Sequence, residues 1–101
     1  MLRIAVPVVL ALTALPVAAQ TEKEISCGHQ SDVVQAVKQA RLDGVKERDL
    51  PSSLSADATW PEKYNNIIPL LAPSIYEKSR KDLKTEDLKT WWYTECLKLG
   101  Q

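Results

Sequence analysis

Phenylalanine is absent from this 101-residue chain, and histidine, cysteine and glycine are scarce. The single histidine is His29, and the chain contains no G-x-S-x-G motif. A serine hydrolase needs that nucleophile turn and a positioned base, so this class of enzyme is not supported. Three glycines leave no phosphate-binding loop, and the chain has no C-x-x-C redox motif and no C-x-x-C-H haem motif. The sequence therefore assigns no catalytic residue, no cofactor and no metal.

An excess of charge of one sign is also lacking. Thirteen Lys and Arg residues balance thirteen Asp and Glu residues, which gives a formal net charge of zero. Proteins that bind nucleic acid usually carry a basic excess. The one basic run, residues 78–84, is interleaved with acidic residues and is typical of a solvated helix end. No nucleic-acid partner is expected.

The longest hydrophobic run stands at the N-terminus. Arg3 precedes an apolar stretch that ends at Pro16. The residues from there to Ala19 include the small side chains that a signal peptidase recognises before its cleavage site. This run is shorter than the about 20 apolar residues of a membrane-spanning helix. We predict a cleavable signal peptide over residues 1–19 and a single helical domain over 20–101. The product would be periplasmic or secreted, with no stable membrane anchor.

Two cysteines remain in an exported chain, and they most simply form one Cys27–Cys96 disulfide. The 82 residues after the signal are 37% hydrophobic and contain neither Phe nor Met, so their core is small. A bridge across a loop of about 70 residues would add on the order of 4 kcal/mol. Metal handling through Cys27, His29 and Cys96 is an alternative, but it lacks a fourth ligand.

The first helix is predicted from Ser31, as N-cap, to about Asp43. Gly44 then occupies the position of a left-handed C-cap residue. Residues 46–58 mix charges, serines and a proline, which indicates a loop with a helical turn at most. Leu50 and Leu54 are the side chains that could attach this loop to the core.

A second helical stretch begins at Thr59, which starts a capping box with Glu62. Its apolar residues recur at spacings of 4, 3, 4 and 4, typical of a helix. They are Trp60, Tyr64, Ile67, Leu71 and Ile75. The stripe passes through Pro69 and Pro73, so this middle helix is predicted to be kinked or broken at Pro69–Pro73. Its C-terminal end would carry the cations Lys78, Arg80 and Lys81.

Thr85 is predicted to cap the last helix. Its apolar face is formed by Leu88, Trp92, Cys96 and Leu99. Helices of about 13 residues are about 20 Å long, whereas a disulfide requires Cα atoms within about 7 Å. A simple up-down-up bundle would separate the two cysteines. We therefore predict an all-α fold, a small disulfide-stapled bundle of three to four short helices, with four segments in an up-down-up-down course favoured.

Three consecutive aromatic residues, 91–93, are the most unusual feature of the chain. Adjacent helical residues point about 100° apart, so the three cannot all face one core. Trp92 belongs to the apolar face, and the aromatic run could simply build the core in place of Phe and Met. The alternative is that Trp91, Tyr93 and Leu97 form a candidate contact surface for a partner protein.

The sequence favours a small exported helical protein that acts by binding another protein. In type it is similar to small periplasmic acid-stress chaperones and to helical immunity proteins, although no motif of either group matches it residue by residue. That similarity implies a chaperone-like, inhibitor or immunity function. A small cell-envelope enzyme that acts on glycan or peptide is the alternative, with Glu62, Glu77 or Glu95 as its carboxylate.

Overall fold

The computed structural model describes residues 20–99, and within that range it contains helices and connecting segments but no strand. The elements, in chain order, are α1 (Glu22–Leu42), η1 (Glu47–Asp49), α2 (Leu50–Ser55), η2 (Glu62–Ile67), α3 (Ile68–Glu77), α4 (Arg80–Thr85) and α5 (Leu88–Lys98), where η marks a 3₁₀-helix. The all-α prediction is confirmed. The predicted count of three to four helices is too low, because α2 and α4 are separate short helices. The predicted signal peptide, residues 1–19, lies outside the described residues.

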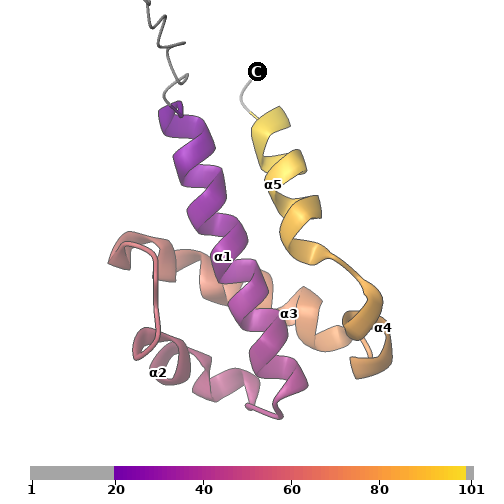
Figure 1. Ribbon diagram of the computed structural model, residues 1–101. Coiled ribbons are helices and arrows are strands. Elements are labelled where there is room, and N and C mark those ends of the chain that lie inside the picture. The colour runs from indigo at the N-terminus through magenta and orange to yellow at the C-terminus, as the bar shows by residue number, and fades with distance from the viewer. Residues whose placement is uncertain (1–19, 100–101) are drawn as a thin grey trace, which may run out of the picture.

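Helix α1 is the central element against which the others pack. Figure 1 shows α5 running antiparallel beside α1, while α3 crosses behind the lower half of α1 and α2 lies at its lower end. Helices α3 and α5 both pack on α1 but make few contacts with each other. Among residues 20–99 no helix is both long enough and apolar enough to cross a bilayer.

The first helix begins at Glu22, well before the predicted start at Ser31. Thr21 is the N-cap, and its Oγ1 accepts a hydrogen bond from the Glu24 backbone N–H at 3.1 Å. The Glu24 side chain accepts in return from the Thr21 N–H, which completes a capping box. Ser31 is instead buried inside α1, where its hydroxyl donates to the Cys27 carbonyl at 2.8 Å. Gly28 consequently lies inside α1, at a cost of about 1 kcal/mol relative to alanine.

The end of α1 is as predicted. Gly44 has a φ of +83°, the left-handed conformation that side chains with a Cβ disfavour, and the Val45 N–H donates to the Ala40 carbonyl at 2.9 Å. The following segment is more helical than predicted, since η1 and α2 occupy it. Leu50 and Leu54 are both buried, so they do attach this segment to the core.

The middle stretch changes from 3₁₀ to α geometry between Ile67 and Ile68, one residue ahead of the predicted break. Pro69 lies in the first turn of α3, where a missing N–H removes no helical bond. Pro73 lies inside the same helix. The predicted capping box at Thr59 is wrong, because Pro61 precedes η2 in an extended conformation and no side chain caps it.

Two boundaries after α3 also differ from prediction. Arg80 and Lys81 do not end the middle helix; they begin α4, which Ser79 caps by accepting from the Asp82 N–H. Thr85 does not cap the last helix; it ends α4. The extended backbone conformation at Glu86 separates α4 from α5.

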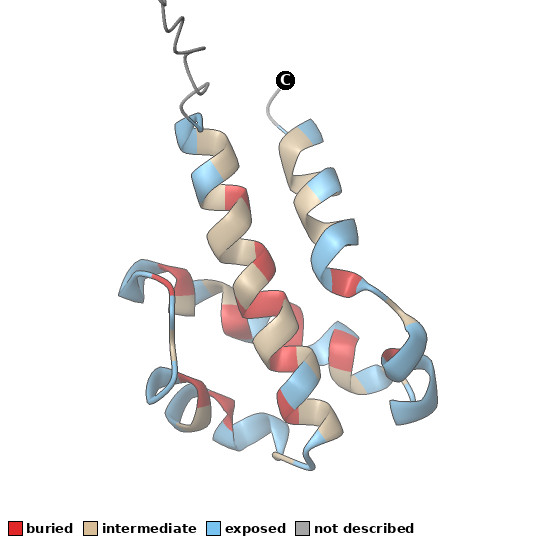
Figure 2. Cartoon of the chain, in the orientation of Figure 1, coloured by how far each residue is buried: buried red, intermediate tan, exposed pale blue. Residues whose placement is uncertain are grey.

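The core lies between α1 and the elements that cross it, and Figure 2 shows its buried residues along the inner side of α1, α2 and α3. Helices α1, α2 and α3 each contribute two or more buried apolar side chains, whereas α4 contributes only Leu83 and η1 contributes none. Helix α5 contributes only Leu88, with Trp92 partly buried, and Leu99 is 70% exposed rather than part of the apolar face. The buried apolar residues are Val33, Val34, Val37, Ala40, Leu50, Leu54, Trp60, Tyr64, Ile68, Leu71, Ala72, Ile75, Leu83 and Leu88.

The Cys27–Cys96 disulfide is present and joins α1 to α5, with the two Cα atoms 5.7 Å apart. Because α1 and α5 run antiparallel side by side, the start of the first helix lies beside the end of the last one. A simple up-down-up bundle would place these two ends too far apart for a disulfide. Cys27 is buried and Cys96 is half-buried. The disulfide thus links α1 to the helix α5, whose one buried residue is Leu88.

Candidate protein-binding groove

An apolar groove lies between α3 and α5, where the two helices rest on α1 without closing on each other. Its cavity measures about 280 Å³. Val34 of α1 is among its lining residues, together with side chains from α3 and α5. We call this cavity the α3–α5 groove; it is lined by Val34, Leu70, Leu71, Ser74, Ile75, Lys78, Leu88, Trp91 and Trp92.

Two large apolar side chains of the groove stand in solvent. Leu70 on α3 is 75% exposed, and Trp91 on α5 is 57% exposed. Two other large hydrophobic residues within 20–99 are exposed, Ile25 and Leu99. Neither lines this groove, although Ile25 lines a second groove between α1 and α5. The α3–α5 groove therefore combines two exposed large apolar side chains with an apolar hollow.

The α3 wall is positioned by helical periodicity. Leu71 and Ile75 turn inward and are buried, which leaves Leu70 and Ser74 on the adjoining outer face. At the C-terminal end of α3 the Tyr76 hydroxyl donates to the Val45 carbonyl at 2.7 Å, and the Arg41 guanidinium lies 5.5 Å from the Tyr76 ring centroid. Burial raises the pKa of the Tyr76 hydroxyl further above its ordinary value.

The α5 wall is positioned by Leu88 and by the two tryptophans. Leu88 is the buried contact of α5 with the core. Trp91 and Trp92 pack edge to face, with ring centroids 6.2 Å apart, an arrangement favoured by the aromatic quadrupole. Trp92 is anchored in turn by its indole N–H, which donates to Gln30 Oε1. The exposed ring of Trp91 is therefore supported by a ring that is itself held to α1.

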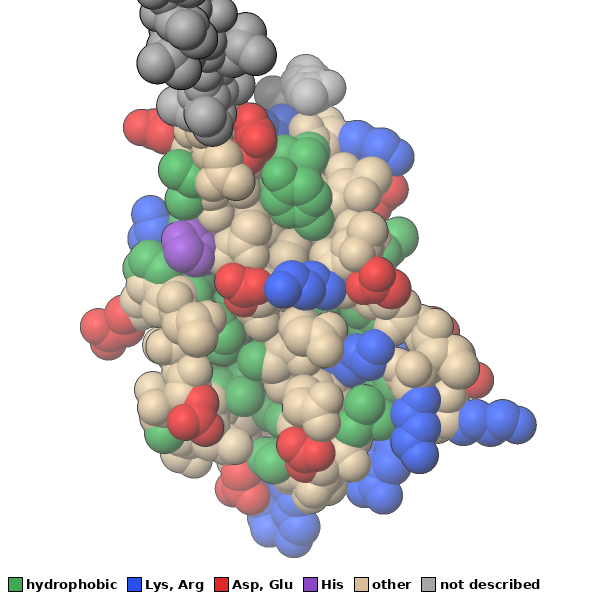
Figure 3. Space-filling view, in the orientation of Figure 1, with side chains coloured by type: hydrophobic (Ala, Val, Ile, Leu, Met, Phe, Trp, Pro, Cys, Tyr) green, Lys and Arg blue, Asp and Glu red, His purple; other side chains and the backbone are tan. Residues whose placement is uncertain are grey.

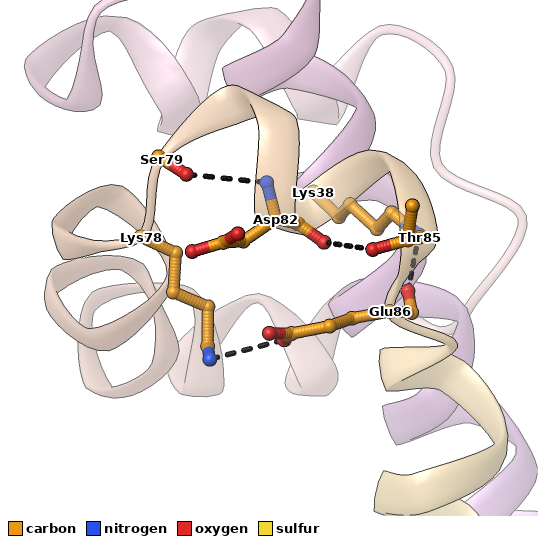
Figure 4. Close-up of polar contacts among 6 residues, drawn as sticks. All are labelled: Lys38, Lys78, Ser79, Asp82, Thr85 and Glu86. Carbon is orange, nitrogen blue, oxygen red and sulfur yellow. Dashed lines mark hydrogen bonds and ion pairs between the residues drawn. The ribbon is translucent and has the colours of Figure 1, made fainter.

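Polar contacts hold the corner where α3, α4 and α5 meet. Figure 4 shows Lys38 and Lys78 approaching Glu86 from opposite sides: Lys38 Nζ donates to the Glu86 backbone carbonyl, and Lys78 Nζ lies 3.0 Å from Glu86 Oε2. Asp82 adds two contacts within α4, accepting from Thr85 Oγ1 through its carbonyl and donating its N–H to Ser79 Oγ. This corner fixes where α5 begins relative to α3.

The mouth of the groove carries both signs of charge. Lys78, Glu86 and Asp87 line an adjoining hollow of about 380 Å³, which shares Leu88 and Trp91 with the groove. Hydrogen bonds from the Thr90 hydroxyl and N–H hold the pKa of the Asp87 carboxyl below its ordinary value, so Asp87 is ionised. The mouth thus presents one ammonium and two carboxylates.

A second, more open groove of about 480 Å³ lies between α1 and α5. His29, Asp32, Lys89 and Tyr93 are among its lining residues, and Lys89 pairs with Asp32 at 3.1 Å. In Figure 3 acidic and basic side chains alternate over this face, while Lys and Arg side chains gather over α4. The mixed charges give this face no net sign with which to select a ligand.

The structure divides the contact surface suggested by the sequence. Trp91 lines the α3–α5 groove, Tyr93 lines the groove between α1 and α5, and Leu97 is half-buried on α5. Sequence reasoning missed Leu70, the most exposed apolar side chain of the groove. Its signal was an apolar residue displaced from the middle helical stripe, although such residues also occur singly on ordinary surfaces.

The residues of the alternative functions are not brought together. Glu62 and Glu77 are exposed, and Glu95 pairs with Lys98 at 3.1 Å. His29 packs against Tyr64, with ring centroids 5.1 Å apart. Both cysteine sulfurs are bonded to each other, and within residues 20–99 no group of three His, Cys, Asp or Glu side chains is arranged to hold a metal ion.

Comparison with known proteins adds no relative: no family model matches the chain, and neither the curated proteins nor the solved structures contain a match. The geometry of the α3–α5 groove is consequently the main guide to function.

Proposed function

We propose that this protein is a small exported helical module that acts by binding another protein through the α3–α5 groove. The observation that carries the proposal is the exposure of Leu70 and Trp91 beside an apolar hollow. Contiguous exposed apolar surface on a small protein marks an interaction site, and tryptophan is among the residues that most often dominate binding energy. The disulfide supports export, because such bridges persist in oxidising compartments.

The exposure of Leu70 and Trp91 favours a protein partner over an enclosed small molecule. Pockets for drug-sized ligands measure roughly 300–1,000 Å³ and enclose most of the ligand. The α3–α5 groove, at about 280 Å³, lies at the lower end of that range, and its large side chains Leu70 and Trp91 are mostly exposed, so they would not enclose a small ligand. It accommodates one large apolar side chain of a partner, with Leu70 and Trp91 packing around it.

The test compares two matched pairs of substitutions. Leu70→Ser with Trp91→Ser removes the groove's exposed apolar side chains, and Ile25→Ser with Leu99→Ser removes the other two exposed ones. Each protein is immobilised and exposed to extract of the exported fraction, and retained proteins are identified by mass spectrometry. A partner lost only with the groove pair supports the proposal. A partner retained by the groove pair, or lost equally with both, overturns it.

The same experiment separates a chaperone-like protein from an inhibitor or immunity protein. A chaperone-like protein would retain many proteins, with an increase when the extract is partly unfolded by acid or heat. An inhibitor or immunity protein would retain one partner at a fixed stoichiometry. The number of proteins that depend on Leu70 and Trp91 therefore distinguishes the first kind from the other two.

A further inference from the structure

The hollow that adjoins the α3–α5 groove combines an exposed indole with a carboxylate. Asp87 and Trp91 both line this hollow of about 380 Å³, and Trp91 also lines the groove. The Trp91 N–H donates to the Asp87 carbonyl at 3.2 Å, so the two residues lie one helical turn apart on the same side of α5. An aromatic ring face attracts a cation, and a carboxylate beside it adds an opposite charge.

The carboxylate of Asp87 is available to such a cation. Its two oxygens each accept one hydrogen bond from Thr90, at 3.0 Å from the N–H and 2.7 Å from the hydroxyl. Both donors are neutral, so they leave the charge uncompensated. A carboxylate has about four acceptor positions, and each oxygen therefore keeps room for a further donor. The ion pairs of the described chain are Lys78–Glu86, Lys89–Asp32 and Lys98–Glu95, and none includes Asp87.

The cations around Asp87 are engaged by other groups. Lys78 lines the same hollow, but its ammonium is paired with Glu86 at 3.0 Å. Lys89 is paired with Asp32 at 3.1 Å. Lys38 donates to the Glu86 backbone carbonyl and is not among the residues that line the hollow. The lining residues thus carry one positive and two negative charges, and this net negative charge is complementary to a cation.

Among cationic side chains, arginine fits the hollow best. Its planar guanidinium can stack on an indole face and can donate two parallel N–H bonds to a carboxylate, whereas an ammonium presents only a point charge. Arginine is also, with tryptophan, among the residues that most often dominate binding energy at interfaces. The α3–α5 groove next to the hollow takes an apolar side chain, and Trp91 borders both.

We propose that the partner protein docks with an arginine whose guanidinium stacks on Trp91 and pairs with Asp87, while a neighbouring apolar side chain of the partner fills the α3–α5 groove. This inference rests on the proposed function and names the chemistry of the partner at the same site. Charge selects the arginine, and the apolar lining of the groove selects its neighbour.

The first test selects ligands from a random-peptide library displayed on phage, with the immobilised oxidised protein as bait. The wild type should enrich peptides that carry an arginine close to a large apolar residue. Asp87 is the N-cap of α5, and Asp87→Asn keeps a capping oxygen while it removes the charge. This variant should lose the arginine excess. Asp57→Asn is the matched control, because Asp57 is an exposed carboxylate that lines a different hollow.

The selected sequences decide the proposal in either direction. An arginine excess that disappears with Asp87→Asn and persists with Asp57→Asn supports it. Peptides with no arginine excess over the starting library overturn it, as does an equal excess with Asp87→Asn. An excess of lysine in place of arginine overturns it too, because an ammonium does not need the stacked and bidentate geometry.

The second test measures the pairing with the most strongly enriched peptide. Isothermal titration calorimetry gives the Kd of this peptide and of a copy with citrulline, a neutral isostere, in place of arginine. With the wild type, citrulline should weaken binding about tenfold; with Asp87→Asn the loss should be much smaller. Trp91→Leu removes the ring but keeps an apolar side chain, and it should weaken the arginine peptide more than the citrulline peptide. Equal losses in the wild type and Asp87→Asn would place the arginine elsewhere.

The outcomes separate this inference from the proposed function. Peptides whose binding depends on Leu70 and Trp91 but not on Asp87 overturn the arginine and leave the groove standing as a binding site. A library that yields no peptide dependent on Asp87 or Trp91 also overturns the arginine, and the capture experiment with Leu70→Ser and Trp91→Ser then decides the proposed function independently. Circular dichroism confirms that each variant is folded.

Discussion

The indole N–H of Trp92 donates to Gln30 Oε1 at 3.2 Å, across 62 residues of sequence, and the Sγ of Cys96 lies 3.7 Å from the same oxygen. Gln30 thereby links the two walls of the α1–α5 interface next to the disulfide. Because Leu88 is the one buried residue of α5, this linkage and the bridge account for much of what holds the last helix in place.

Removal of the disulfide should lower the stability of the domain substantially. The bridge joins residues 69 positions apart, so its loss in Cys27→Ala with Cys96→Ala should cost about 4 kcal/mol. For a domain of this size, that corresponds to a fall in Tm of more than about 15 °C. Thermal unfolding followed by circular dichroism measures it. Wild type treated with a dithiol should show the same fall, and the double variant should not respond to the dithiol; a Tm unchanged by both treatments would show the bridge to be dispensable.

The two adjacent tryptophans should differ sharply in their contribution to stability. Trp92→Ala removes a half-buried indole and leaves Gln30 without its donor, so it should cost about 3 kcal/mol. Trp91→Ala removes a ring that is mostly exposed and should cost less than about 1 kcal/mol. Urea unfolding at equilibrium gives both values. A larger cost for Trp91 than for Trp92 would mean that the faces of α5 are assigned wrongly.

The boundaries that sequence reasoning placed wrongly share a physical cause. Ser31, Thr59 and Thr85 all have the side-chain chemistry of an N-cap, and each stands before a plausible helix. Which hydroxyl actually caps depends on the backbone conformation around it, and tertiary packing decides that. Ser31 bonds to a carbonyl inside α1 and Thr85 to one inside α4, uses that local sequence does not distinguish from capping.

Thr21→Ala tests the capping box that sets the true start of α1. Loss of its side-chain bond to the Glu24 N–H should cost about 1 kcal/mol. The change should be local, with faster hydrogen exchange at the amides of the first turn and little change beyond Cys27, where the disulfide holds the helix. Gln20→Ala is the control, since Gln20 makes no cap. Equal exchange rates in both variants would mean that the capping box does not stabilise the helix end.

The apolar pattern of the middle stretch was more informative than its capping residues. Of the five residues of the predicted stripe, Ile67 is half-buried and the other four are buried, although the helix changes type among them. The four are Trp60, Tyr64, Leu71 and Ile75. Burial follows the spacing of the apolar residues at every third or fourth position, and that spacing is compatible with a local change between 3₁₀ and α geometry. The groove could not be read in this way, because Leu70 and Trp91 are more than 20 residues apart and meet only through α1.

Asp87 should make the folded state depend on pH in the acid range. Hydrogen bonds from the Thr90 hydroxyl and N–H hold the pKa of the Asp87 carboxyl below 3.8, so the folded state favours the carboxylate. The stabilisation is present above the ordinary pKa and is lost as the pH falls through the lowered value in the folded state. Thr90→Val should raise the pKa of Asp87 toward 3.8, as measured by NMR titration of the carboxyl carbon. Thr94→Val on the same helix is the control; equal pKa values in both variants would exclude the Thr90 hydroxyl as the cause.

Helix α5 is clamped at both ends of the segment that forms the groove wall. Lys38 and Lys78 hold the connection at Glu86, and the disulfide holds Cys96, with Trp91 between the two clamps. A helix segment held by contacts at both ends moves less than one held at a single end. The wall therefore loses little conformational entropy when a ligand binds, and more of the apolar contact energy is expressed as affinity than a freely hinged helix would allow.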